Sequence, residues 1–161
     1  MEDITATTSE TTQAAPDGDL RIEDGRILIT GGTGFVGGHI VRELVVRVSE
    51  PVCLVRNPEH LGHTLPKEQR SRLKGVGGDI FDRDALARAA EGCVAAIHLI
   101  GIIEENRILG PPFQRLHVDA TQAVVNACTQ AGFPPNLSMS PLGNRPPALR
   151  AYHQTKGAGT P

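Results

Sequence analysis

The chain has 161 residues, of which 39% are hydrophobic and 21% are charged, and its formal net charge is -2 at pH 7. This length fits one domain with a core of its own. The charge balance gives no basic footprint for nucleic acid, and no apolar run approaches the ~20 residues that would span a bilayer. We therefore expect a protein that binds small molecules, with no nucleic-acid partner and no integral membrane segment.

The first residues have a composition that does not favour folding. Residues 1–20 are rich in Thr, Ala and Ser, contain five acidic residues and lack Lys and Arg. Such a segment buries too little apolar surface to fold, and it resembles neither a transit peptide nor a secretory signal. The sequence predicts a disordered tail over residues 1–22 and one nucleotide-binding domain over residues 23–161.

The three cysteines are far apart and lack the spacing of a metal site or a disulfide framework. We expect Cys53, Cys93 and Cys128 to be reduced thiols in the core of a cytoplasmic protein, and we expect no metal site.

The first ordered segment predicts a strand, a glycine-rich turn and a helix. An apolar run over residues 27–30 leads into Gly31-Gly-Thr-Gly-Phe-Val-Gly37, and a helical pattern follows over residues 39–47. Glycines at such a turn let the backbone approach a ligand, while free amides and the positive end of the helix dipole face a pyrophosphate. The pattern predicts a dinucleotide site; the alternative is a tight turn that binds nothing. No Gly-Lys-Ser/Thr closes the run, which excludes a Walker phosphate loop.

Short apolar runs then alternate with helical patterns, which is typical of a parallel sheet covered by crossover helices. We predict strands at residues 52–55, 76–80, 94–99 and 137–140, and helices at residues 82–90 and 113–131. Asp82 is expected to cap the first of these helices. Residues 59–74 are expected to be a polar loop, with one helical turn near Glu68 left open. The predicted fold class is α/β, a Rossmann-like doubly wound parallel sheet of about five strands in the order 3-2-1-4-5.

Several motifs together resemble the short-chain dehydrogenase/reductase superfamily. They are Thr30-Gly-Gly-Thr-Gly-Phe-Val-Gly37, Leu54-Val-Arg-Asn-Pro58, Gly78-Asp-Ile80, His98-Leu-Ile-Gly101, Ser138-Met-Ser140 and Tyr152-x-x-x-Lys156. The set looks most like the atypical, extended branch related to the nucleotide-binding accessory subunit of respiratory complex I, which is similar to NAD-dependent epimerases and dehydratases. The resemblance implies that the chain is truncated at its C-terminal side, before the strands that build the substrate lobe of relatives.

The resemblance implies a cofactor site built on the glycine turn. Its pyrophosphate contacts would come from Gly31, Gly34, Phe35, Val36 and Gly37. Arg56 ends the second strand, where a cation suits the 2′-phosphate of NADP, so we expect NADP with NAD left open. The alternative for Arg56 is a solvated arginine. Asp79 resembles the acid that holds the adenine amino group, although it can also be a simple turn residue, and Gly101 would admit the nicotinamide ribose.

The resemblance also implies a catalytic group of Ser140, Tyr152 and Lys156. Tyr152 and Lys156 are four residues apart, so on a helix they share one face, where the phenol would exchange a proton with an unknown small-molecule substrate. His117 stands where many relatives carry an asparagine, and we expect it to be structural. One hypothesis is an NADP-dependent oxidoreductase or epimerase. The alternative is a non-catalytic nucleotide-binding module or truncated remnant; a homo-oligomer is left open in either case.

Overall fold

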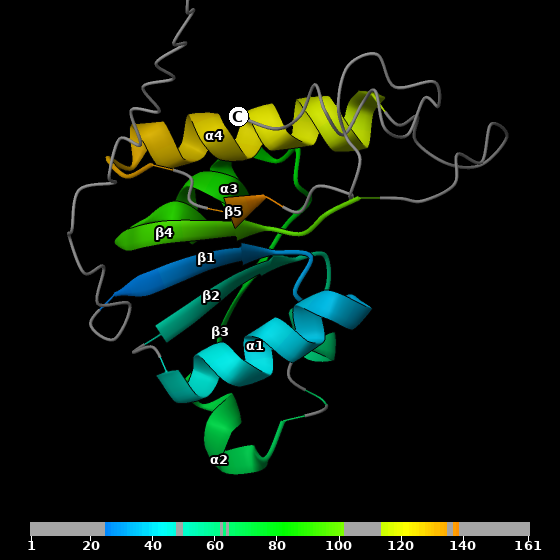
Figure 1. Ribbon diagram of the computed structural model, residues 1–161, viewed down its shortest axis with the longest axis vertical. Helices are drawn as coiled ribbons and strands as arrows, with labels where there is room; N and C mark the ends of the chain where they lie inside the picture. The colour runs from blue at the N-terminus through cyan, green and yellow to red at the C-terminus, as the bar shows by residue number, and fades with distance from the viewer. Residues whose placement is uncertain are drawn as a thin grey trace, which may run out of the picture.

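The computed structural model describes residues 25–47, 50–61, 63, 65–101, 114–134 and, for the backbone alone, 137–138. Within these residues, parallel strands form one sheet in the order β3-β2-β1-β4-β5 (Figure 1). The strands are β1 (Arg26–Thr30), β2 (Glu50–Val55), β3 (Lys74–Gly77), β4 (Cys93–His98) and β5 (Leu137–Ser138). The observed order is the predicted one, and the doubly wound α/β fold class is confirmed.

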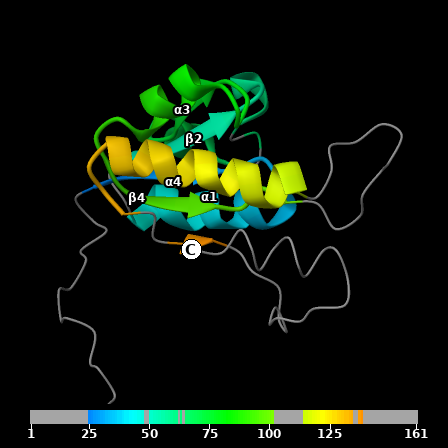
Figure 2. The same ribbon diagram turned by 90° about the horizontal axis from the view of Figure 1, so that it is seen from above.

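Helices cover both faces of this sheet. In Figure 2, α1 (Phe35–Arg47) lies on one side of the sheet and α3 (Arg83–Ala90) on the other. The long helix α4 (Ala120–Gln130) shares the α3 side, because both helices contribute to one hydrophobic core. Shorter helical turns complete the described part of the chain: η2 (Pro58–His60), α2 (Lys67–Arg70) and η3 (Arg115–Asp119).

Alternating side chains of the central strands supply the two cores, as the period of two along a strand requires. Leu28 and Leu54 face the core made with α3 and α4. Ile29 and Cys53, their neighbours along the strands, face the core made with α1. Both core faces of the central strands are therefore buried, which explains why these strands read as continuous apolar runs in the sequence.

Two predicted boundaries were wrong. Helix α1 begins at Phe35, four residues before the predicted start. The helical hydrogen bonding starts inside the glycine turn, because the Gly38 amide already donates to the Gly34 carbonyl at 2.8 Å. Strand β3 covers Lys74–Gly77 instead of residues 76–80. The Asp79 carboxylate accepts a hydrogen bond from the Phe81 amide at 3.0 Å, which turns the chain away from the sheet.

The other predicted elements are present with small differences at their ends. Asp82 caps α3, and α2 is the helical turn near Glu68 that the sequence left open. The predicted helix over 113–131 is divided in the described residues into the π-helical turn η3 and α4. Phe113, Met139 and Ser140, which the predictions placed at element ends, lie outside the described residues, as does the predicted tail over residues 1–22.

The carboxyl ends of the strands form an aligned edge. Thr30 pairs in register with Leu54 on one side and with His98 on the other. The buried Thr30 hydroxyl and His98 Nδ1 lie 2.6 Å apart, so a side-chain hydrogen bond reinforces this row. The turn after β1 lies next to the end of β4, and the helices that follow these two strands, α1 and α4, cover opposite faces of the sheet. Ligands bind at such a point in sheets of this kind.

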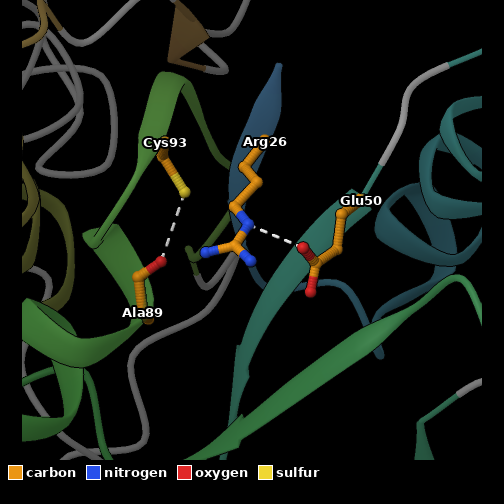
Figure 3. A network of polar contacts seen from close by, with 4 residues as sticks. All are labelled: Arg26, Glu50, Ala89 and Cys93. Carbon is orange, nitrogen blue, oxygen red and sulfur yellow. Dashed lines mark hydrogen bonds and ion pairs between the residues drawn. The ribbon is translucent and has the colours of Figure 1, made fainter. Parts of the chain in front are cut away.

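Polar contacts also tie the opposite edge of the sheet together (Figure 3). Arg26 Nε on β1 lies 2.6 Å from Glu50 Oε2 on β2, and Cys93 Sγ donates to the Ala89 carbonyl oxygen at 3.3 Å. Cys93, Cys53 and Cys128 are buried free thiols. Burial raises the pKa of Cys53 to about 12 and those of Cys93 and Cys128 to about 11, so all three are protonated and unreactive near neutral pH.

Across the described segments, no helix combines the length and the apolar character needed to cross a membrane.

Candidate cofactor site

The glycine turn is shaped by two close approaches that exclude side chains. Gly31 has a φ of +79°, and a Cβ there would lie 3.0 Å from the backbone carbon of Leu99. A Cβ on Gly37 would lie 2.1 Å from the carbonyl oxygen of Gly31. Glycine is therefore required at both positions, one for its conformation and one for the contact of α1 with the turn.

The first turn of α1 is open to a ligand. The Gly34 amide already donates to the Gly31 carbonyl at 3.0 Å, whereas the amides of a helix's first turn lack acceptors within the helix. The adjoining side chains do not fill the space, because Phe35 is 86% exposed and Val36 is 40% exposed. The backbone cradle thus fits the pyrophosphate of a dinucleotide, with Phe35 and Val36 offering their amides.

A cavity of about 530 Å³ opens beside this turn, at the carboxyl edge of the sheet. Four residues that the sequence assigned to the cofactor line it together: Gly31, Arg56, Asp79 and Gly101. They come from four separate segments of the chain, namely the ends of β1 and β2, the turn after β3 and the segment after β4. The fold therefore brings together residues as far apart in the chain as Gly31 and Gly101, which agrees with a single binding site.

Arg56 and Asp79 differ in how they are engaged. Arg56 is exposed and makes no ion pair or side-chain hydrogen bond with the described residues. Asp79 is also exposed, and one of its carboxylate oxygens caps the turn at Phe81. The sequence left two roles open for Asp79, closing a turn or holding the adenine amino group. The two roles are compatible, because this turn residue also lines the cavity.

Two side chains in the cavity wall, Phe81 and Arg115, were not predicted from the sequence. The Arg115 guanidinium carbon lies 4.7 Å from the centroid of the Phe81 ring, which is the geometry of a cation–π contact. Two arginines and one aspartate then line the cavity, so its wall favours an anionic ligand. No signal in the sequence pairs these two residues, since they lie far apart in the chain and belong to no motif.

The remaining predicted residues separate into buried and undescribed ones. His117 is 1% exposed, and its carbonyl oxygen accepts a hydrogen bond from the Thr121 hydroxyl at 2.8 Å. The predicted catalytic residues Ser140, Tyr152 and Lys156 lie outside the described residues. The described residues therefore include those predicted to hold the cofactor and none of those predicted for catalysis.

Comparisons with known proteins agree with this architecture. Residues 28–140 match the model of the 3-beta hydroxysteroid dehydrogenase/isomerase family. A ceramide reductase of Caulobacter vibrioides is 35% identical over 136 residues, which are 84% of this chain and 40% of that protein. The human 3 beta-hydroxysteroid dehydrogenase type 7 is 32% identical over 108 residues, or 65% of this chain and 29% of that protein.

A solved structure shows the same fold at low sequence identity. The UDP-N-acetylglucosamine 4-epimerase of Methanobrevibacter ruminantium M1, determined in complex with UDP-N-acetylmuramic acid, superimposes with a TM-score of 0.63 at 19% identity. The match covers 85% of this chain and 48% of the epimerase. The chain thus spans less than half the length of each of these relatives.

The fold and the open glycine turn define a Rossmann-type protein with a dinucleotide cradle. The chain belongs to the 3-beta hydroxysteroid dehydrogenase/isomerase family, whose members use nicotinamide dinucleotides. This agrees with the predicted dehydrogenase/reductase superfamily. The narrower resemblance to the complex I accessory subunit and the expected truncation stay predictions.

Proposed function

We propose that the chain binds a nicotinamide dinucleotide, with NADP preferred over NAD, and takes part in hydride transfer of the reductase or epimerase type. The observation that carries this proposal is the gathering of Gly31, Arg56, Asp79 and Gly101 around one cavity beside an open helix N-terminus. Arg56 supports the preference for NADP, because its guanidinium has no acidic partner among the described residues and can pair with a phosphate.

The chemistry is proposed for Ser140, Tyr152 and Lys156. When bound, the dinucleotide supplies or accepts the hydride. Tyr152 would donate the proton to the substrate oxygen in reduction and accept it in oxidation, Lys156 would stabilise the phenolate, and Ser140 would hydrogen-bond the substrate. The substrate is an unidentified small molecule with a carbonyl or hydroxyl group, and the buried free thiols support a cytoplasmic setting.

A titration of the full chain with NADPH and with NADH tests the cofactor assignment. The wild type is expected to bind NADPH at least tenfold more tightly, and Arg56→Asp is expected to reverse this order, since an acid at the strand end favours the free ribose hydroxyls. Arg83→Asp is the matched control, because Arg83 lies on α3 and does not line the cavity. If neither nucleotide binds at millimolar concentration, the proposal is wrong.

The same protein separates catalysis from binding alone. NADPH consumption with a panel of carbonyl substrates, abolished by Tyr152→Phe, would support the enzyme. Tight NADPH binding with no turnover would instead favour a nucleotide-binding module. The described cavity supports this alternative, because all the predicted site residues that line it were predicted to hold the cofactor.

A further inference from the structure

A second cavity, of about 460 Å³, lies between α3 and α4 on the face of the sheet that these two helices cover. It shares Phe81 with the cavity beside the glycine turn, and all its other lining residues are different. Its volume falls within the roughly 300–1,000 Å³ of small-molecule sites. The cavity is therefore large enough for a ligand of its own.

The floor of this second cavity is apolar. Leu86 of α3 and Ala127 of α4 are 2% and 7% exposed, and both belong to the core beneath the helices. Phe81 and Ala123 are partly buried and pack against the same core. An aliphatic or aromatic group that enters the cavity is therefore removed from water against apolar surface, which favours its binding.

Two opposite charges stand at the rim of the cavity. Arg83 is the first residue of α3, and Asp119 directly precedes α4 without capping it through its side chain. Both residues are exposed, and neither forms an ion pair with any residue that the structure describes. Since the two charges do not neutralise each other, the rim can take a ligand that carries both signs.

Two amide side chains of α4 add directed hydrogen-bonding groups to the wall. Gln122 Nε2 donates to Asn126 Oδ1 at 2.9 Å, so the two amides hold each other in one orientation. This bond leaves the Gln122 oxygen as an acceptor and the Asn126 nitrogen as a donor. The amide pair therefore suits a ligand that has both an N–H group and a carboxylate.

We propose that this cavity binds a free α-amino acid with a large apolar side chain. The ligand's carboxylate pairs with Arg83, its ammonium group pairs with Asp119, and its side chain lies on the apolar floor beside Phe81. An apolar anion would use only the arginine and an apolar amine only the aspartate, so the two separate charges favour the zwitterion. The inference goes beyond the proposed dinucleotide, because Arg83 and Asp119 line this cavity alone.

Calorimetric titration of the full chain with L-phenylalanine and L-leucine tests the class of ligand. Both are expected to bind at millimolar concentration. Glycine has the same two charges and no side chain, so it should bind roughly tenfold more weakly because it leaves the floor uncovered. N-acetyl-L-phenylalanine lacks the ammonium group and L-phenylalaninamide lacks the carboxylate, and each should bind about tenfold more weakly than L-phenylalanine.

Two variants assign the charges to the two ends of the ligand. Arg83→Gln should weaken L-phenylalanine binding about tenfold without weakening that of L-phenylalaninamide, which has no carboxylate to lose. Asp119→Asn should weaken L-phenylalanine binding by a similar factor without weakening that of N-acetyl-L-phenylalanine. Arg88→Gln is the matched control, because Arg88 is an exposed residue of α3 that does not line the cavity.

Loss of affinity in Arg83→Gln and Asp119→Asn, with binding retained in Arg88→Gln, supports the inference. Equal affinities of the wild type for L-phenylalanine, glycine and the two capped derivatives overturn it, and so does the absence of binding of every one of them at millimolar concentration. Unchanged L-phenylalanine binding in both variants also overturns it, provided that circular dichroism shows the variants folded. Amino-acid binding by a protein that binds neither NADPH nor NADH contradicts the proposed function and leaves this site supported.

Discussion

Two glycines at the start of α1 have opposite tolerances for a side chain. A Cβ on Gly37 would lie 2.1 Å from the Gly31 carbonyl oxygen, whereas a Cβ on Gly38 would have no heavy atom within 4 Å. The contact at Gly37 is with backbone, so it cannot be relieved by a rotamer change. Steric contact with the backbone therefore requires glycine at position 37 but does not require it at position 38.

Gly37→Ala is expected to destabilise the protein by about 2 kcal/mol, because α1 must move away from the turn. It should also abolish dinucleotide binding, since that movement displaces the amides of the first helical turn. Gly38→Ala, the matched control, should stabilise the protein by about 0.5 kcal/mol through helix propensity. Urea denaturation measures both changes, and equal midpoints for the two variants would contradict the steric argument.

At this scale the sequence pointed to residues that line one cavity, Gly31, Arg56, Asp79 and Gly101, and their roles toward a cofactor stay predictions. It could not show how side chains pair in space. The glycine turn, Arg56, Asp79 and Gly101 were predictable because each occupies a fixed place relative to a strand end. The contact of Arg115 with Phe81 was not, because it depends on how η3 lies over the turn after β3. The closeness of Arg42 on α1 to His60 after β2 was also missed, since both line one cavity that joins a helix face to a loop.

At the scale of elements, the position of α3 is fixed by a cap that the sequence made visible. Both Asp84 N and Ala85 N donate to Asp82 Oδ1, at 3.1 and 3.0 Å. This satisfies two amides that a helix leaves without partners at its start. Asp82 directly follows Phe81, which lines the cavity, so the cap lies next to that wall in the chain.

Asp82→Ala should lower the free energy of unfolding by about 1 kcal/mol, because both cap hydrogen bonds are lost. Asp82→Asn keeps an acceptor oxygen and should retain most of the stability. The measurement is the urea midpoint at constant m-value for the three proteins. A wild-type midpoint in Asp82→Ala would mean that packing of α3 against the core makes the cap dispensable.

The error in β3 has a physical cause at the same scale. Apolar Val76 and Ile80 suggested one strand, yet the pairing with β2 runs from Lys74 to Gly77. Exposed residues with little apolar character can extend a strand when the neighbour supplies the hydrogen bonds, and Asp79 can end it by closing a turn. Alternation of side chains carries no information about these backbone partners, so sequence patterns locate strands more reliably than their ends.

At the scale of the whole molecule, the sheet order brings the glycine turn and the cavity lined by Arg56 and Asp79 to one edge of the sheet. The strand order was predictable because right-handed crossovers leave few arrangements for five parallel strands. The substrate of the whole protein could not be predicted, because neither the described cavity nor the family identifies it. The part of the cofactor that stabilises the fold should accordingly be its adenosine half.

Nucleotide binding should therefore raise the melting temperature in an order set by the ligand's parts. A ligand at a hundredfold excess over its Kd stabilises a protein by about 2.7 kcal/mol, which corresponds to roughly 5–10 °C for a chain of this size. We expect such a shift with NADPH and most of it with 2′,5′-ADP. At the same concentration, nicotinamide mononucleotide should give a much smaller shift because it lacks the adenosine and cannot fill the cavity between Arg56 and Asp79. Differential scanning fluorimetry on one protein sample measures all three, and a larger shift with nicotinamide mononucleotide than with 2′,5′-ADP would place the dominant contacts outside that cavity.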